Sequence, residues 1–215
     1  DTSSLASVRA FVSEYGRLGL PLHVLVANAG IMMGPRRTSA DGFELQLATN
    51  YVGHWLLARE LLPTLKASGT PQRRARVVTV SSIAAHFGGF RWGDMMHACG
   101  RYDSQACYSA SKLAQVVWLK ETARRLEAEG CATVATYSIE PGIVNTPLAE
   151  GITDDPKMAN NLRKGLTVAE GAKTQVHVAS SAAAEGITGR HWSKCAPMSA
   201  LSFAIAPRSF NQGAK

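Results

Sequence analysis

Arg76-Val-Val-Thr-Val-Ser-Ser82 is a run of mostly apolar, β-branched residues that ends in two hydroxyls. A continuous apolar run of this kind favours a strand that is buried on both faces, as strands in parallel sheets are. Leu22-His-Val-Leu-Val-Ala27 and Thr133-Val-Ala-Thr-Tyr-Ser-Ile139 follow the same pattern, and we expect a short last strand at residues 189–193. The three long runs therefore predict parallel strands.

Segments around these runs carry apolar residues at helical spacing. We expect helices at residues 1–16, 41–66, 105–129 and 167–181. In the last of them, Thr167 with a glutamate three residues later has the pattern of a capping box. Strands that alternate with helices predict an α/β domain with a parallel sheet and right-handed connections.

Composition sets the broad class. The 215 residues are 46% hydrophobic and 18% charged, which suits one soluble domain, and no apolar run approaches the ~18 residues of a membrane span. The net charge is +7, with arginines grouped at residues 36–37 and 73–76. These groups favour solvated loops; attraction for a phosphate-bearing cofactor or an anionic membrane is the second interpretation. No aromatic pattern supports nucleic-acid binding.

The four cysteines are scattered and lack the spacing of a metal site. We therefore expect reduced thiols, an intracellular protein and no metal site.

Tyr108-Ser-Ala-Ser-Lys112 carries the chemistry. On a helix, residues four apart lie on one face, so the phenol and the ammonium can point into one site. A phenol with a pKa near ~10 needs a neighbouring cation to act as an acid or base at neutral pH. Oxidation of an alcohol to a carbonyl needs such a group. The spacing alone arises by chance in roughly one chain of five like this one.

Two polar residues add to this motif. Ser82 ends a parallel strand, where α/β sheets bind their ligands. Asn50 lies on the apolar face of the helix expected at 41–66, and its buried amide must find partners. It is either part of a site or an asparagine satisfied by backbone at a helix kink. The apolar connection at 83–107 is a pocket wall, a lid or packing.

The combination resembles the short-chain dehydrogenase/reductase superfamily. Its members show, in this order, Asn-Ala-Gly after a strand, serine at a strand end, Tyr-x-x-x-Lys, and Pro-Gly followed by threonine. The segments 48–54, 76–82 and 108–114 are similar to the retinol-dehydrogenase-like branch. The resemblance implies that Tyr108 is the general acid/base and that Lys112 lowers its pKa and binds the nicotinamide ribose. It implies that Ser82 orients the substrate oxygen and that Asn50 holds a water in a proton relay.

The same resemblance implies a cofactor, NADP or alternatively NAD. Asn28, Ala29 and Gly30 would line the adenosine-ribose side. The nicotinamide end would be met by Tyr108 and Lys112 and by Pro141, Gly142, Ile143, Val144 and Thr146. Asp1 would receive the adenine amino group.

Three features depart from the family pattern. Its usual Asn-Asn-Ala-Gly begins with Ala27 here, and Glu140 stands where the branch often has histidine or asparagine. No glycine-rich T-G-x-x-x-G-x-G turn occurs. We therefore expect a Rossmann-like, doubly wound parallel sheet without its first three strands and glycine-rich turn. Residues 1–196 would form this partial domain and 197–215 a tail. The strand at 22–27 would be an exposed apolar edge, and the chain alone would bind the cofactor weakly or not at all.

The resemblance implies an NAD(P)-dependent oxidoreductase that interconverts a lipophilic alcohol (retinoid, polyprenoid or steroid-like) and its aldehyde or ketone. The alternative is a truncated, non-catalytic isoform or pseudoenzyme that acts through protein contacts. The helices at 41–66 and 105–129 would form a homodimer face. The whole protein would be cytoplasmic, or associated with the endoplasmic reticulum or lipid membranes.

Overall fold

The computed structural model describes residues 1–149, 160 and 163–199. Its helices are α1 (Leu5–Leu18), α2 (Leu45–Leu47), α3 (Gly53–Ser68), α4 (Ser104–Ala128) and α6 (Val168–Ser180). Its strands are β1 (Val24–Ala27), β2 (Ala75–Val80), β3 (Val134–Glu140), β4 (Arg190–Ser193) and β5 (Ala196–Pro197). Short turns of other helix types are η1 (Ala48–Val52), η2 (Ile83–Phe87), η3 (Pro147–Ala149) and η4 (Ala182–Ala184).

The strands form one sheet in the order β1-β2-β3-β4-β5. The first four are parallel, and β5 returns antiparallel beside β4. The predicted parallel sheet is confirmed. Because Ala27 pairs with Thr79 and Val80 with Ile139, the carboxyl ends of β1, β2 and β3 lie at one edge.

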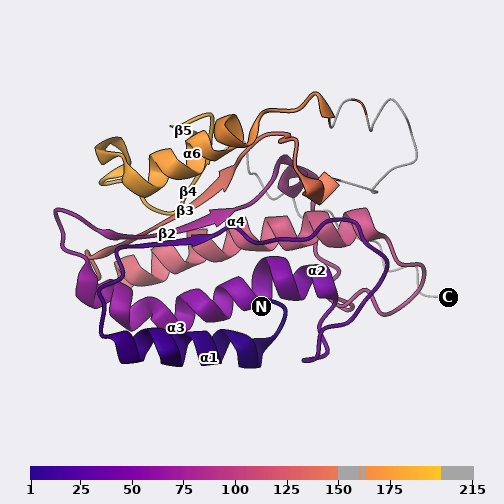
Figure 1. The fold of residues 1–215 in the computed structure, drawn as a ribbon, viewed down its shortest axis with the longest axis horizontal. Helices are drawn as coiled ribbons and strands as arrows, with labels where there is room; N and C mark the ends of the chain where they lie inside the picture. The colour runs from indigo at the N-terminus through magenta and orange to yellow at the C-terminus, as the bar shows by residue number, and fades with distance from the viewer. Residues whose placement is uncertain (150–159, 161–162, 200–215) are drawn as a thin grey trace.

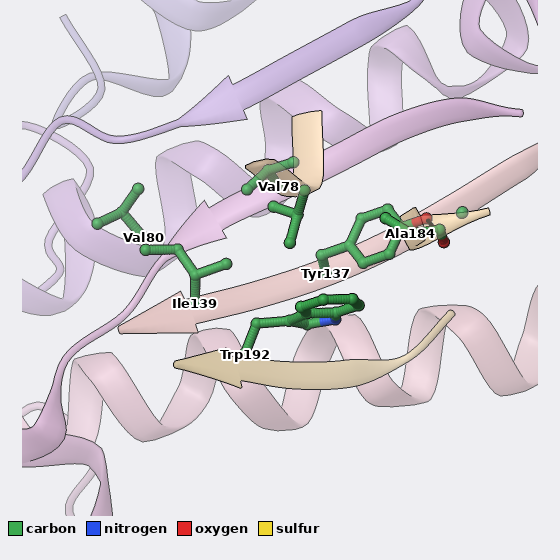
Figure 2. Close-up of a cluster of buried hydrophobic side chains, with 8 residues drawn as sticks. Val78, Val80, Tyr137, Ile139, Ala184 and Trp192 are labelled. Carbon is green, nitrogen blue, oxygen red and sulfur yellow. Dashed lines mark hydrogen bonds between the residues drawn. The ribbon is translucent and has the colours of Figure 1, made fainter. Parts of the chain in front are cut away.

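Helices cover both faces of the sheet. Figure 1 shows α6 on one side and α3 and α4 on the other, with α1 packed outside α3. Val77 faces α3 and α4, where it packs with Leu65 and Leu119. The next residue of β2, Val78, faces α6 and packs with buried aromatic residues of β3 and β4 (Figure 2). This alternation explains why β2 is apolar throughout, and it confirms the doubly wound α/β fold.

One expected helix begins later than its pattern suggests. The segment at 41–66 becomes helical only at Leu45, because the carboxylate of Glu44 caps the first turn by accepting from the N–H groups of Gln46 and Leu47. Asp41 instead accepts a hydrogen bond from the N–H of Leu5, 2.9 Å away, at the start of α1. The other long helices agree with prediction to within a few residues, and the capping box at Thr167 is present.

Strand β1 forms one edge of the described sheet. Val24 and Val26 are 37% and 41% exposed on the side of the sheet that α6 covers farther along. This agrees with the expected apolar edge.

At the other end of the sheet, β5 crosses the expected domain boundary at residue 196. Residues 200–215 lie outside the described part, so the tail stays a prediction. No helix among the described residues is long and apolar enough to cross a membrane.

Candidate active site

Three loops leave the sheet at the carboxyl edge of β1, β2 and β3. They carry Asn28–Gly30, Ser81–Ser82 and Pro141–Thr146, so the parallel strands bring together segments that lie more than 50 residues apart. Helix α4 passes the same edge with its first turns. Ligands of open α/β sheets bind at this position.

Tyr108 and Lys112 lie together on α4, as their spacing predicts. Both are buried, and the Nζ atom of Lys112 is 5.7 Å from the centre of the Tyr108 ring. Nζ donates a hydrogen bond to the carbonyl of Val80 over 2.9 Å. Because Val80 ends β2, this bond fixes the lysine against the strand that leads into Ser82.

Ser82 lies near the phenol of Tyr108 and also caps the short helix η2. Burial raises the pKa of Tyr108, and the hydroxyl of Ser82 opposes that rise. Burial lowers the pKa of Lys112 to about 8. Lys112 does not contribute to the direction of the shift in Tyr108, so the expected lowering of the Tyr108 pKa by Lys112 stays a prediction.

Asn50 lies fully buried in the π-helical turn η1. Its Oδ1 accepts from the N–H of Ile31 over 2.9 Å, and its Nδ2 donates to the Ile31 carbonyl and to the Ser111 hydroxyl, each over 3.0 Å. The asparagine thus joins the loop after β1 to α4. Of the two alternatives that the sequence allowed for Asn50, these bonds match an asparagine whose amide is satisfied by the backbone at an irregular helical turn. The role of holding a water molecule stays a prediction.

Gly30 fits between the asparagine and the lysine. A Cβ atom on Gly30 would lie 3.1 Å from Oδ1 of Asn50 and 3.6 Å from Nζ of Lys112. These three residues therefore meet at one point of the edge. Asn28 and Ala29, just before Gly30, are exposed there.

The segment from Pro141 to Thr146 is held by Leu166. The N–H of Leu166 donates to the Ile143 carbonyl over 2.8 Å, and the N–H of Asn145 donates to the Leu166 carbonyl over 2.9 Å. Gly142 has a φ of 83°, which favours glycine. Val144 packs so closely on α6 that a Cβ on Gly171 would lie 2.4 Å from it. Ile143 is 54% exposed, which leaves its side chain available to a ligand.

Two hollows border this edge. Asp1 lines one of about 280 Å³ together with Ile31 and Met32, which directly follow Gly30. The other, of about 820 Å³, is lined in part by the connection after Ser82, including Phe87. That connection therefore forms a pocket wall, one of the roles expected for it.

The sequence did not predict several hydrogen-bond partners of Tyr108, Lys112 and Asn50. Ser81 donates to the Lys112 carbonyl over 2.7 Å, and Ser111 donates to the Tyr108 carbonyl over 2.7 Å. The Nδ1 of His54 lies 3.0 Å from the Asn50 carbonyl, and burial, followed by the charge of Lys112, lowers the pKa of His54 to about 4. Ser111 lies three residues after Tyr108 and His54 four after Asn50, so helical spacing was the available signal.

Comparisons with known proteins agree with this geometry. A model of the short chain dehydrogenase family matches residues 1–157. Human polyprenol dehydrogenase is 40% identical over 195 residues, which are 89% of this chain and 58% of that protein. Human retinol dehydrogenase 12 is 37% identical over 196 residues, 91% of this chain and 60% of that protein. The chain thus spans less than two thirds of the length of these relatives.

Solved structures share the fold. A crystal structure of an uncharacterised protein from Mycobacterium paratuberculosis is 31% identical with a TM-score of 0.66, covering 90% of this chain and 60% of that one. A 3-ketoacyl-(acyl-carrier-protein) reductase from Brucella melitensis is 25% identical with a TM-score of 0.64, covering 90% and 74%. From the matched residues, the identity to its relatives and the shared architecture, we conclude that this chain belongs to the short-chain dehydrogenase family.

Proposed function

We propose that this chain carries the acid–base centre of an NAD(P)-dependent oxidoreductase that interconverts a lipophilic alcohol and its carbonyl compound. The observation that carries the proposal is the buried Tyr108 phenol near Ser82, with the Lys112 ammonium 5.7 Å from the centre of its ring. This arrangement lies at the carboxyl edge of a parallel sheet, where a substrate can reach it.

The residues divide the proton chemistry among them. Ser82 would hydrogen-bond the substrate oxygen and place it beside the phenol. Tyr108, as phenolate, would take the hydroxyl proton of the alcohol, and as phenol would return it to the carbonyl oxygen. Lys112, with a pKa of about 8, keeps most of its charge at neutral pH and would stabilise the phenolate in its buried position.

A nicotinamide dinucleotide supplies the hydride chemistry when it is bound. The residues proposed for its nicotinamide and ribose end are Lys112, which lies beside Gly30 and Tyr108, and the exposed Ile143 at the same edge. The Brucella reductase is described as complexed with NADH, which supports this cofactor class. We propose NADP as the preferred form because of the branch that the sequence resembles.

The proposed substrates are lipophilic alcohols such as polyprenols and retinoids. The names of the human relatives, polyprenol dehydrogenase and retinol dehydrogenase 12, support this class. The cleft of about 820 Å³ is lined by Met33 and Phe87 together with charged residues such as Arg101, and the exposed Trp92 lies on the same connection as Phe87. Apolar side chains beside a cleft suit a long hydrocarbon substrate.

The test is Tyr108→Phe in the whole gene product, assayed with a polyprenol and a retinol and with each nicotinamide cofactor. We expect turnover to fall at least ~100-fold, since a positioned acid/base contributes 10²–10⁴-fold. Tyr15→Phe is the matched control, because that phenol bonds only the Pro21 carbonyl among the described residues. Unchanged turnover in Tyr108→Phe would refute the proposal, and an inactive wild type would favour the non-catalytic alternative.

A further inference from the structure

Three side chains that the proposed mechanism does not use converge behind the carboxyl edge of the sheet. They are His86 in η2, Glu140 at the end of β3, and His191 in β4. One ligand atom from each lies within 4.8 Å of the others. The Oε2 atom of Glu140 is 3.4 Å from Nε2 of His86 and 3.8 Å from Nε2 of His191. They lie more than 50 residues apart, so no sequence spacing reveals them.

A second layer of hydroxyls orients two of these groups. Ser193 donates a hydrogen bond to Oε1 of Glu140 over 2.7 Å, which turns the other carboxylate oxygen toward the histidines. The hydroxyl of Ser138 lies 2.9 Å from Nδ1 of His191. When Nδ1–H donates to that hydroxyl, Nε2 keeps its lone pair on the side of Glu140. Metal-binding histidines and carboxylates are held by partners of this kind.

We propose that His86, Glu140 and His191 form a binding site for one divalent metal ion of the zinc class. Two imidazoles and a carboxylate are a common zinc ligand set, with a fourth position left for water. Bonds of about 2.0–2.2 Å in a tetrahedron place ligand atoms roughly 3.3–3.5 Å apart, so the observed 3.4 and 3.8 Å need little adjustment. The Oε2 atom of Glu140 is buried and faces the Nε2 atoms of both histidines, as expected of a ligand atom that shares one metal ion with them.

The position of the site gives it a role. Glu140 directly precedes Pro141 and Gly142, the start of the segment proposed to meet the nicotinamide. A metal ion bound by β3, β4 and η2 would fix the point from which that segment leaves the sheet. The competing explanation is a carboxylate paired with two protonated imidazoles, which would bind no metal.

The experiment is a Zn²⁺ titration of the 215-residue chain in competition with a chromogenic chelator at neutral pH. We expect one equivalent of zinc per chain, and at least tenfold weaker binding in Glu140→Gln and in His86→Asn. Ser193→Ala should weaken binding about 10–100-fold, since it removes an orienting partner and no ligand. His23→Asn and Cys99→Ser replace exposed groups and should leave the affinity unchanged.

Co²⁺ in place of zinc reports the ligands independently. We expect the strong visible bands of four-coordinate Co²⁺, without the near-ultraviolet absorption of cobalt–thiolate bonds. Circular dichroism of each variant shows that it is folded before its affinity is compared. Absence of zinc binding in the wild type, equal affinity in folded Glu140→Gln, or loss of binding in Cys99→Ser would each overturn the proposal.

Discussion

The ammonium group of Lys112 donates a hydrogen bond to the backbone carbonyl of Val80 over 2.9 Å. The bond ties the middle of α4 to the last residue of β2, which precedes Ser81 and Ser82. It also holds a charged group in an environment where burial lowers the pKa of the lysine to about 8 from 10.5. Lys112 therefore stabilises the position of the site while it costs the folded protein free energy.

That cost predicts an unusual result for Lys112→Met. A pKa lowered by about 2.5 corresponds to roughly 3 kcal/mol, and the lost charged bond to the Val80 carbonyl offsets about 1.5–3 kcal/mol of the gain. We expect the variant to be inactive and yet at least as stable as the wild type at pH 7 in urea unfolding. Lys120→Met, at an exposed position of the same helix, should change stability little.

The pH dependence of this difference provides a second check. Below about pH 8 the ammonium is charged in the folded and unfolded chains alike, so its burial cost is present in full. Between pH 8 and 10.5 the folded protein loses the proton first, and the wild type gains stability as the pH rises. The advantage of Lys112→Met should therefore shrink across this window. An advantage that grows instead would contradict the assigned direction of the shift.

Asn50→Leu should be strongly destabilising. The substitution keeps the size of the side chain but leaves the N–H and carbonyl of Ile31 without their partner. We expect the free energy of unfolding to fall by about 2–4 kcal/mol, measured by urea denaturation. Asn145→Leu removes one exposed bond to the Arg163 carbonyl and should cost less than about 1 kcal/mol. If Asn50→Leu lost as little unfolding free energy as Asn145→Leu, the buried bonds of Asn50 would contribute little to stability.

Gly30→Ala tests the close packing at the edge of the site. The added methyl group would lie 3.1 Å from Oδ1 of Asn50, which must then move. We expect a loss of about 1–2 kcal/mol of stability and lower turnover in the active protein. Gly34→Ala, in the same loop, meets nothing within 4 Å and should be neutral or slightly stabilising. Unchanged stability in Gly30→Ala would show that Gly30 and Asn50 are packed less closely than the 3.1 Å distance indicates.

The cofactor should bind weakly to these 215 residues alone. They contain no glycine-rich T-G-x-x-x-G-x-G turn to hold the pyrophosphate. Quenching of the four tryptophans by NADPH should therefore show no saturation at micromolar concentration. Saturation in that range would reject this prediction and would mean that other residues bind the phosphates.

Much of the fold could be predicted because its signals are local. The apolar runs around Val26 and Val78 gave strands to within two residues, and the four-residue spacing placed Tyr108 and Lys112 on one face. Long-range contacts could not be predicted. Nothing in the sequence pairs Lys112 with the Val80 carbonyl, and the cap at Glu44 competes with an otherwise continuous helical pattern. The neighbours of Glu140 likewise emerge only when β3 and β4 are placed side by side.

Val144 interlocks with Gly171, and Leu166 bonds the backbone on both sides of Val144. Helix α6 and residues 141–146 are therefore packed rigidly together, although only residues 141–146 lie at the carboxyl edge of the sheet. From these contacts we expect that a ligand that immobilises Ile143 at that edge would also restrain the first turn of α6. Slower hydrogen–deuterium exchange of the amide protons in that turn would therefore report that a ligand occupies the carboxyl edge. The measurement needs no label near Tyr108.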